Sequence, residues 1–441
     1  MKKESKQSKG VLACLLFSLL AGFSSVSEAV IDGVTGTTFN LTAKQGYIST
    51  PDGNSILVWG YALDDGLMQY PGPTLIVNQG DSITVTLNND LASPVSIQFP
   101  GQTGLTATGG SAGLLAQEST GPADTVSYSF VANNAGTFMY QSATQPELQV
   151  EMGLAGALIV RPPAANQAYN HADSAYDHEY LIFMSQMDPE VHFLVQTGRA
   201  NQIDNSDYSP VYWFINGRNF PDIVTGPHNP LLPHQPYDSL PRVHPGEKAL
   251  IRLLSFSRDL HPFHTHGNHF RLIARDGRLL ESAPGAGADL SFENFTLGMV
   301  PGATYDALWS WTGEKLGWDI YGTALADNGI DLAHSCDGST THTGTSADFD
   351  SITHEYCPDH GVEIPVQLPA LQEMAFGGFY SGSPYLGGEE SLPPGEGGLN
   401  INGSLFHIWH SHAEKELVNF DVFPGGSMTM MIVEPPGVPI P

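Results

Sequence analysis

The sequence predicts an all-β protein composed of two Greek-key β-sandwiches in tandem, with a long irregular insertion in the second. Three observations support this fold class. The 441 residues are too many for one hydrophobic core, Gly and Pro are abundant at 48 and 32 residues, and stretches of long helical periodicity are missing. Short alternating apolar runs separated by turn residues are typical of β-sandwiches.

Residues 1–29 have the features of a signal peptide. Four lysines precede an apolar run from Val11 to Phe23, and Ser27-Glu-Ala29 provides a cleavage site of small residues. No later stretch reaches the ~18 continuous apolar residues that a membrane-spanning helix requires. We therefore expect an exported protein, periplasmic or extracellular, without a membrane span.

The chain is strongly acidic, with a formal net charge of −29. Residues 1–29 contain four Lys and two Glu, so the chain without them has a net charge of −31. This charge disfavours nucleic acids and anionic membrane surfaces as partners. It favours solubility and a local enrichment of cations, and its simplest meaning is a solvated extracellular surface.

The first sandwich is expected over residues 32–165. Gln79-Gly-Asp81 and Asn88-Asn-Asp90 mark turns between its strands, and Arg161-Pro-Pro163 ends it. The predicted strands cover residues 55–59, 74–77, 82–87, 96–99, 126–130, 136–140 and 156–160.

The second sandwich is expected over residues 172–441, with the insertion at about 319–401. The insertion is rich in Gly, Asp and Ser and shows no core pattern. It contains Cys336 and Cys357, which in an oxidising compartment most simply form a disulfide. A zinc site is the alternative, because Cys357-Pro-Asp-His360 has a spacing that zinc tolerates. The predicted strands cover residues 180–183, 211–216, 248–254, 305–309 and 428–433 and the two histidine motifs.

The clearest chemistry lies in those motifs, His261-Pro-Phe-His-Thr-His-Gly267 and Trp409-His-Ser-His412. Residues two apart on a strand share a face, so each motif presents a pair of imidazoles on one side. Imidazole nitrogens suit copper, zinc, iron or nickel. We expect His264, His266, His410 and His412 to form one metal site. The alternative is a polar seam in which these histidines satisfy one another's hydrogen bonds.

Several motifs resemble those of the multicopper oxidases, which are built from cupredoxin domains. Tyr70-Pro-Gly-Pro-Thr-Leu-Ile-Val77 resembles the signature of that family's first domain, and Gly136-Thr-Phe-Met-Tyr140 a strand that flanks its second histidine motif. Ile215-Asn-Gly-Arg-Asn-Phe-Pro221 and both histidine motifs resemble the second half of a laccase. The layout is similar to the two-domain laccases, which assemble as trimers. The resemblance implies cupredoxin-type sandwiches, copper as the cofactor and a homotrimer.

The sequence departs from this family in its first domain. An oxidase of the family uses four His-x-His pairs for a three-copper cluster. Gln98-Phe-Pro-Gly101 and Gln141-Ser-Ala143 stand where the first two pairs belong. All 17 histidines lie between His171 and His412, so the first domain contains none.

The blue-copper ligands that the resemblance implies are also replaced. Ser411 stands where the family has its cysteine, and Glu416 stands where it has a histidine. A hydroxyl cannot replace a soft thiolate as the defining ligand of such a site. Only His261 remains, and it is equally well explained as a turn residue beside Pro262. We retain His261 and Glu416 as additional metal-ligand candidates.

Two functions remain open, and a third is a weaker alternative. The first is an exported copper-binding protein of this family that stores, carries or senses the metal. The second is a copper-dependent oxidoreductase that acts on a small-molecule reductant or on metal ions. The third is an interaction scaffold that keeps only the fold. Metal content separates the third from the others, and turnover under oxygen separates the first two.

Overall fold

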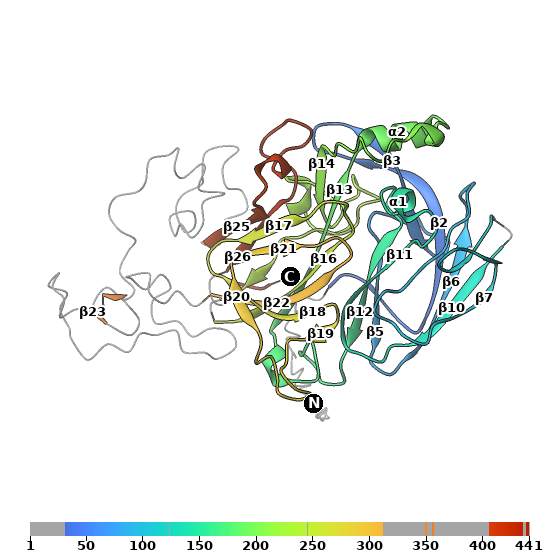
Figure 1. Cartoon of the computed structure of the whole chain (residues 1–441). Coiled ribbons are helices and arrows are strands. Elements are labelled where there is room, and N and C mark those ends of the chain that lie inside the picture. The colour runs from blue at the N-terminus through green and yellow to red at the C-terminus, as the bar shows by residue number, and fades with distance from the viewer. Residues whose placement is uncertain are drawn as a thin grey trace, which may run out of the picture.

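The computed structural model describes residues 31–122, 124–244, 246–311, 349–350, 355–356, 405–434 and 438–440. These residues form mainly strands, which confirms the predicted all-β class (Figure 1). The predicted signal peptide, the predicted disulfide between Cys336 and Cys357 and almost all of the predicted insertion lie outside the described residues. Among the described residues, no helix is both long enough and apolar enough to span a membrane.

Residues 34–161 form two sheets that share one hydrophobic core. One sheet has the strand order β1-β5-β12-β11, and the other has the order β4-β3-β2-β6-β10-β7. The strands are β1 (Val34–Thr35), β2 (Thr38–Ser49), β3 (Ser55–Leu63), β4 (Met68–Gln69), β5 (Gly72–Asn78), β6 (Ser82–Asn89), β7 (Thr106–Gly109), β10 (Val126–Val131), β11 (Gly136–Gln141) and β12 (Ala155–Arg161), with a hairpin of β8 (Ser111–Ala112) and β9 (Gln117–Glu118).

Strand β6 shows why these segments form sheets. Its side chains alternate between the core and the surface, and Ile83 and Val85 are almost completely buried. On the outer face, the Thr84 hydroxyl lies 3.2 Å from that of Ser129 on the antiparallel strand β10. The predicted strand at 96–99 is wrong, because this segment makes only isolated bridges, at Val95 and Gln98.

Residues 178–433 contribute a second pair of sheets. The larger has the order β14-β13-β16-β22-β18-β19, with β20 also paired to β18, and the smaller has the order β15-β26-β25-β17-β21. The strands are β13 (His178–Met187), β14 (Tyr212–Ile215), β15 (Arg242–Val243), β16 (Lys248–Ser255), β17 (His261–Thr265), β18 (Phe270–Arg275), β19 (Arg278–Leu279), β20 (Phe292–Asn294), β21 (Thr296–Met299), β22 (Thr304–Ser310), β25 (Leu405–Ser411) and β26 (Met428–Val433), with a separate pair of β23 (Phe349–Asp350) and β24 (Glu355–Tyr356).

Short helices lie between these strands. The α-helices are α1 (Pro146–Gln149) and α2 (Pro189–Gln196), and the 3-10 turns are η1 (Ala172–Ser174), η2 (Ala200–Gln202), η3 (Asp222–Val224) and η7 (Glu414–Glu416). Helix α2 begins where Pro189 follows Asp188, whose carboxylate accepts a hydrogen bond from the backbone N–H of Glu190 at 2.9 Å.

The two halves are in direct contact. Tyr70 of the first half packs edge-on against Phe214 of the second, with ring centroids 5.5 Å apart. A buried polar network crosses the same boundary, because Arg252 donates to Glu179 at 2.6 Å and to Thr137 at 2.8 Å. The division into two domains, at residues 32–165 and 172–441, stays a prediction.

Candidate metal centre

Strands β17 and β25 bring the two histidine motifs together. They pair antiparallel, and His264 lies directly opposite His410. The neighbouring positions face the core, where the rings of Phe263 and Trp409 meet edge to face with centroids 6.2 Å apart. Because side chains alternate along a strand, burial of these aromatic residues places His264 and His410 on the other face of the sheet.

All four predicted histidines gather on this face. The ring of His264 has its centroid 4.9 Å from that of His266 and 4.8 Å from that of His412. The Nε2 atoms of His266 and His410 are 3.3 Å apart. Two nitrogens bound tetrahedrally to one ion at about 2 Å are separated by about 3.3 Å. This cross-strand pair therefore has the spacing of two ligands of one metal ion.

The outer ring nitrogens of two of these histidines have polar partners. Nδ1 of His264 lies 2.6 Å from the hydroxyl of Thr296 on β21, and Nδ1–H of His410 donates to the carbonyl of Ser411 at 2.7 Å. Hydrogen bonds of this kind orient metal-binding imidazoles and leave the second nitrogen for the metal. His412 is half exposed, with Nδ1 3.4 Å from the carboxylate of Glu414.

The environment of these rings favours neutral imidazoles. Burial, followed by the neighbouring rings of His266, His410 and His412, lowers the pKa of His264 to about 4. Burial is also the largest cause that lowers the pKa of His266 and of His410. A metal binds the neutral imidazole, so these shifts keep the ligand form available below the usual histidine range.

The four nitrogens do not converge on one point in these rotamers. No three of the histidines' possible ligand atoms lie within 4.8 Å of one another. Among the described residues, this spacing is found only at His178, His244 and Glu247. The structure thus shows a close pair, His266 and His410, with His264 and His412 beside it. Binding of one ion by all four requires side-chain rotation.

His261 lies on the core side of β17, and Glu416 lies in the 3-10 turn η7 that follows β25. Both are buried, and Nδ1 of His261 is 2.8 Å from a carboxylate oxygen of Glu416. Nε2 of His261 lies 2.5 Å from the hydroxyl of Ser257. Ser411 is also buried on this side, and its hydroxyl accepts a hydrogen bond from the backbone N–H of Ala413 at 3.3 Å. The structure therefore pairs His261 with Glu416 and separates both from the four histidines.

The glutamine segments of the first half also lie side by side. The backbone N–H of Gln98 donates to the carbonyl of Gln141 at 2.8 Å, and the reverse bond measures 3.1 Å. The two segments that the family resemblance equates with histidine pairs are thus neighbours in space. They present amide side chains in place of imidazoles.

His407 is a buried histidine that no sequence motif singles out. This residue lies on the core side of β25, where both ring nitrogens are buried without a hydrogen-bond partner among the described residues. Burial, and then His266, lowers its pKa to about 3. A Cβ atom on Gly267 would lie 2.5 Å from the His407 ring, so only glycine fits beside it. Strand periodicity could have shown that position 407 faces away from His410, but no spacing pattern marks it as functional.

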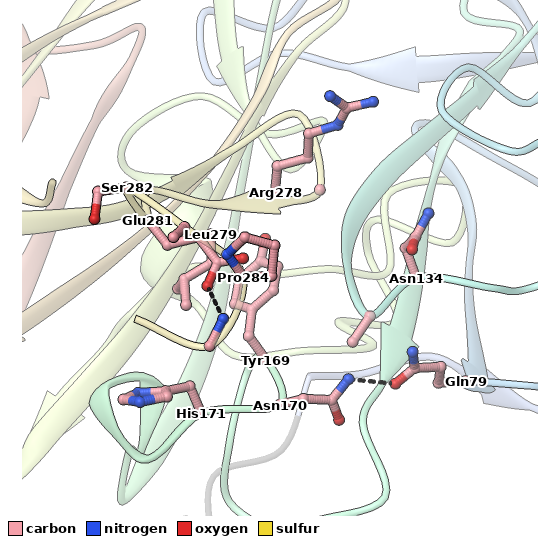
Figure 2. Close-up of a pocket in the computed structure, with 14 residues that line it drawn as sticks. Gln79, Asn134, Tyr169, Asn170, His171, Arg278, Leu279, Glu281, Ser282 and Pro284 are labelled. Atoms are coloured by element: carbon pink, nitrogen blue, oxygen red, sulfur yellow. Dashed lines mark hydrogen bonds between the residues drawn. The ribbon is translucent and has the colours of Figure 1, made fainter. Parts of the chain in front are cut away.

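A cavity of about 600 Å³ lies elsewhere, between the first half and the β18–β19 hairpin (Figure 2). Its lining is largely polar and includes Tyr169, His171 and Arg278. Asn170 donates to the side-chain oxygen of Gln79 at 2.8 Å within it. None of the four predicted histidines lines this cavity, so it is not part of the candidate metal centre.

Residues 57–165 match a family model described as multicopper oxidase. The chain is 37% identical over 120 residues to L-ascorbate oxidase from Cucurbita pepo var. melopepo, which covers 26% of this chain and 20% of that protein. It is 36% identical over 121 residues to the copper-containing nitrite reductase of Alcaligenes xylosoxydans xylosoxydans, which covers 26% of this chain and 35% of that protein. The matched segments thus span only a fifth to a third of these relatives.

The fold resembles solved structures along most of its length. The blue copper oxidase from Nitrosomonas europaea superposes with a TM-score of 0.54 at 18% identity, over 89% of this chain and 85% of that one. A structure titled multicopper oxidase mgLAC gives a TM-score of 0.53 at 18% identity, over 92% and 87%. At these identities the likeness establishes the fold alone.

Proposed function

We propose that this chain, whose first domain belongs to the multicopper oxidase family, is an exported copper-binding protein that holds the metal at His264, His266, His410 and His412. One observation carries the proposal: β17 pairs with β25 so that the Nε2 atoms of His266 and His410 are 3.3 Å apart. Clustered imidazoles suit copper but also zinc and nickel. The copper-containing nitrite reductase and the multicopper oxidases among its relatives favour copper.

The residues around the histidines have distinct roles in this proposal. Thr296 and the carbonyl of Ser411 orient the rings of His264 and His410. Burial lowers the pKa of His264, His266 and His410 and so favours their neutral form, which is the form that binds metal. Copper bound there would supply a redox-active Lewis acid. Half-exposed His412 leaves an access route from solvent to that ion.

The proposal also includes loss of the blue-copper site. Ser411 provides a hydroxyl in place of a thiolate, and Glu416 accepts a hydrogen bond from His261 in place of a second histidine. Without that site the chain has no electron-entry route of the laccase type. Storage, transport or sensing of copper is therefore favoured over turnover.

The second candidate function is a copper-dependent oxidoreductase that uses a small-molecule reductant. The partial exposure of the histidine face favours it, because a small reductant can reach the metal directly. A homotrimer is part of the proposal only because the layout resembles that of the two-domain laccases. Size-exclusion chromatography with light scattering tests that assembly.

The proposed function is tested with residues 30–441 loaded with Cu²⁺ and dialysed. Elemental analysis and EPR should detect bound copper, and His266→Ala combined with His412→Ala should remove most of it. The matched control, Gln98→Ala with Gln141→Ala, alters the equivalent pair of the first domain and should leave copper content unchanged. Equal copper in the histidine variant and the parent would contradict the assignment.

A second arm separates the two candidate functions. Laccase dyes under oxygen should show no turnover, because half of the ligands of a three-copper cluster are missing. Dye oxidation that follows copper content and disappears in the His266→Ala, His412→Ala variant would instead support the oxidoreductase.

A further inference from the structure

A second group of metal-binding side chains lies at the other end of the five-stranded sheet. His178 is the first residue of β13, His244 directly follows β15, and Glu247 directly precedes β16. All three residues are buried, with exposed fractions of 4%, 4% and 6%. Three segments that are distant in the sequence thus deliver two imidazoles and one carboxylate to a single interior point.

The donor atoms are close enough to share one ion. A carboxylate oxygen of Glu247 lies 2.7 Å from Nε2 of His178 and 3.1 Å from Nδ1 of His244. These three donors form the one set of three within 4.8 Å in the described part of the chain. Ligands of an ion with bonds of about 2 Å are separated by about 3 Å, so small side-chain movements would admit the metal.

Three polar contacts of the group converge on a single oxygen of Glu247. Nδ1 of His244 faces Glu247 while its Nε2 lies 2.7 Å from the carbonyl of Val438. A neutral imidazole carries one N–H, so it cannot donate to both oxygens. The same oxygen of Glu247 already accepts the backbone N–H of His244 at 2.8 Å.

We propose that His178, His244 and Glu247 bind a divalent cation of borderline softness, Zn²⁺ foremost. Two imidazoles and a carboxylate are a common zinc ligand set. With the ion in place, Nδ1 of His244 binds metal and its Nε2–H donates to Val438, the outer hydrogen bond typical of a metal-bound histidine. Each imidazole–carboxylate contact then becomes metal coordination.

This site is separate from the four histidines. Strand β26 connects the two regions, because its first residue, Met428, pairs with His410 and its last, Val433, pairs with Val243 next to His244. Six strand residues span about 16 Å, so the two groups cannot share an ion. A redox-inactive ion at this buried position ties β13 to the β15–β16 connection and to the chain near Val438. Its role is structural.

Zinc binding is measured in a background that lacks the proposed copper site, the variant His264→Ala, His266→Ala, His410→Ala, His412→Ala. Failure of the copper proposal therefore does not affect this result. After loading with Zn²⁺ and dialysis, adding Glu247→Gln should lower the zinc content by about one ion per chain. The matched control is His192→Gln, which alters a buried histidine elsewhere and should not change it.

Three further measurements distinguish zinc binding from a metal-free contact between these side chains. In EDTA, the background and the Glu247→Gln chain should have similar circular dichroism, which establishes that both fold. Zinc should then raise the melting temperature of the background and not that of the Glu247→Gln variant. X-ray absorption at the zinc edge should show nitrogen and oxygen ligands. Equal zinc content in the two chains, or no effect of zinc on the background, would show that these residues form a metal-free histidine–glutamate ion pair.

Discussion

Each half of the molecule contains two neighbouring segments with similar backbone pairing and different side chains. In the first half, Gln98 and Gln141 exchange backbone hydrogen bonds of 2.8 and 3.1 Å. In the second, His264 lies opposite His410 in an antiparallel register. Beneath each pair is a similar aromatic contact, Phe99 with Tyr140 and Phe263 with Trp409, and both have ring centroids 6.2 Å apart.

The comparison separates the residues that hold the strands together from those that are available to bind a ligand. The aromatic residues beneath both pairs are buried in hydrophobic cores, so burial rather than ligation holds the strands together. The polar positions above them can then change from imidazole to amide without loss of the fold. We infer that a few outward-facing side chains decide which half offers clustered imidazoles to a metal.

The largest change in this comparison is expected when the blue-copper ligands are restored. Glu416→His places an imidazole next to buried His261, and Ser411→Cys adds a thiolate on the same side of the sheet. Copper-loaded variant protein should turn deep blue through copper–thiolate charge transfer, whereas the copper-loaded parent should not. Optical and EPR spectra of both proteins measure the difference.

The control for this prediction is Ser411→Ala with Glu416→His, which supplies the imidazole without sulfur and should stay pale. A deep blue colour in the parent would contradict the ligand assignment. It would mean that Cys336 or Cys357 reaches the copper.

A smaller effect is expected from transferring histidines to the first half. Gln98→His with Gln141→His creates a cross-strand imidazole pair in a hydrogen-bonded register, with Cβ atoms about 5 Å apart. In the variant that lacks the four native histidines, this pair should bind one copper ion per chain. Its affinity should be weaker than that of the parent, because it offers two imidazoles in place of four.

Copper titration by calorimetry measures that gain, and Gln98→His alone is the control that should bind much less. If the double substitution adds no copper, backbone pairing of this kind is insufficient. The second half must then owe its site to features beyond the side chains, such as the ring-orienting contact from Thr296.

The sequence was sufficient to predict the all-β class, the relationship to multicopper oxidases and the gathering of the four histidines. The strand period and two short motifs carried that information. It could not predict the group of His178, His244 and Glu247, because His178 and Glu247 are 69 positions apart and lack any local spacing signal. The predicted strand at 96–99 was wrong because backbone groups of this segment bond to tyrosine hydroxyls instead of a strand. The N–H of Ile97 donates to Tyr128 at 3.1 Å, and the carbonyl of Ser96 accepts from Tyr61 at 3.3 Å. The pKa values of the buried histidines could not be predicted either, because they depend mainly on burial.

The smallest predicted effect concerns pH and one buried contact between the two halves. His192 on α2 reaches across to the first half, where its Nδ1–H donates to the carbonyl of Leu57 at 2.5 Å. Burial lowers the pKa of His192 from 6.5 to about 4. Between pH 6.5 and about 4, His192 is protonated in the unfolded chain and neutral in the folded chain. The free energy of unfolding therefore decreases as the pH falls through this range. At pH 4.5 this loss should be about 2 to 3 kcal/mol relative to pH 7.

Glu151 beside His192 acts in the opposite sense. Burial raises its pKa to about 7, so its contribution to stability is full below 4.5 and is lost as the pH rises through 7. The effect of His192 is therefore isolated by comparing the parent with His192→Gln, which keeps an N–H donor for Leu57 but cannot titrate. Urea unfolding at pH 7 and pH 4.5 should show that the variant loses about 2 to 3 kcal/mol less on acidification. Gln196→Ala, on the exposed side of the same helix, controls for damage to α2 and should behave like the parent. Equal losses in His192→Gln and the parent would mean that His192 does not make the contact between the halves sensitive to acid.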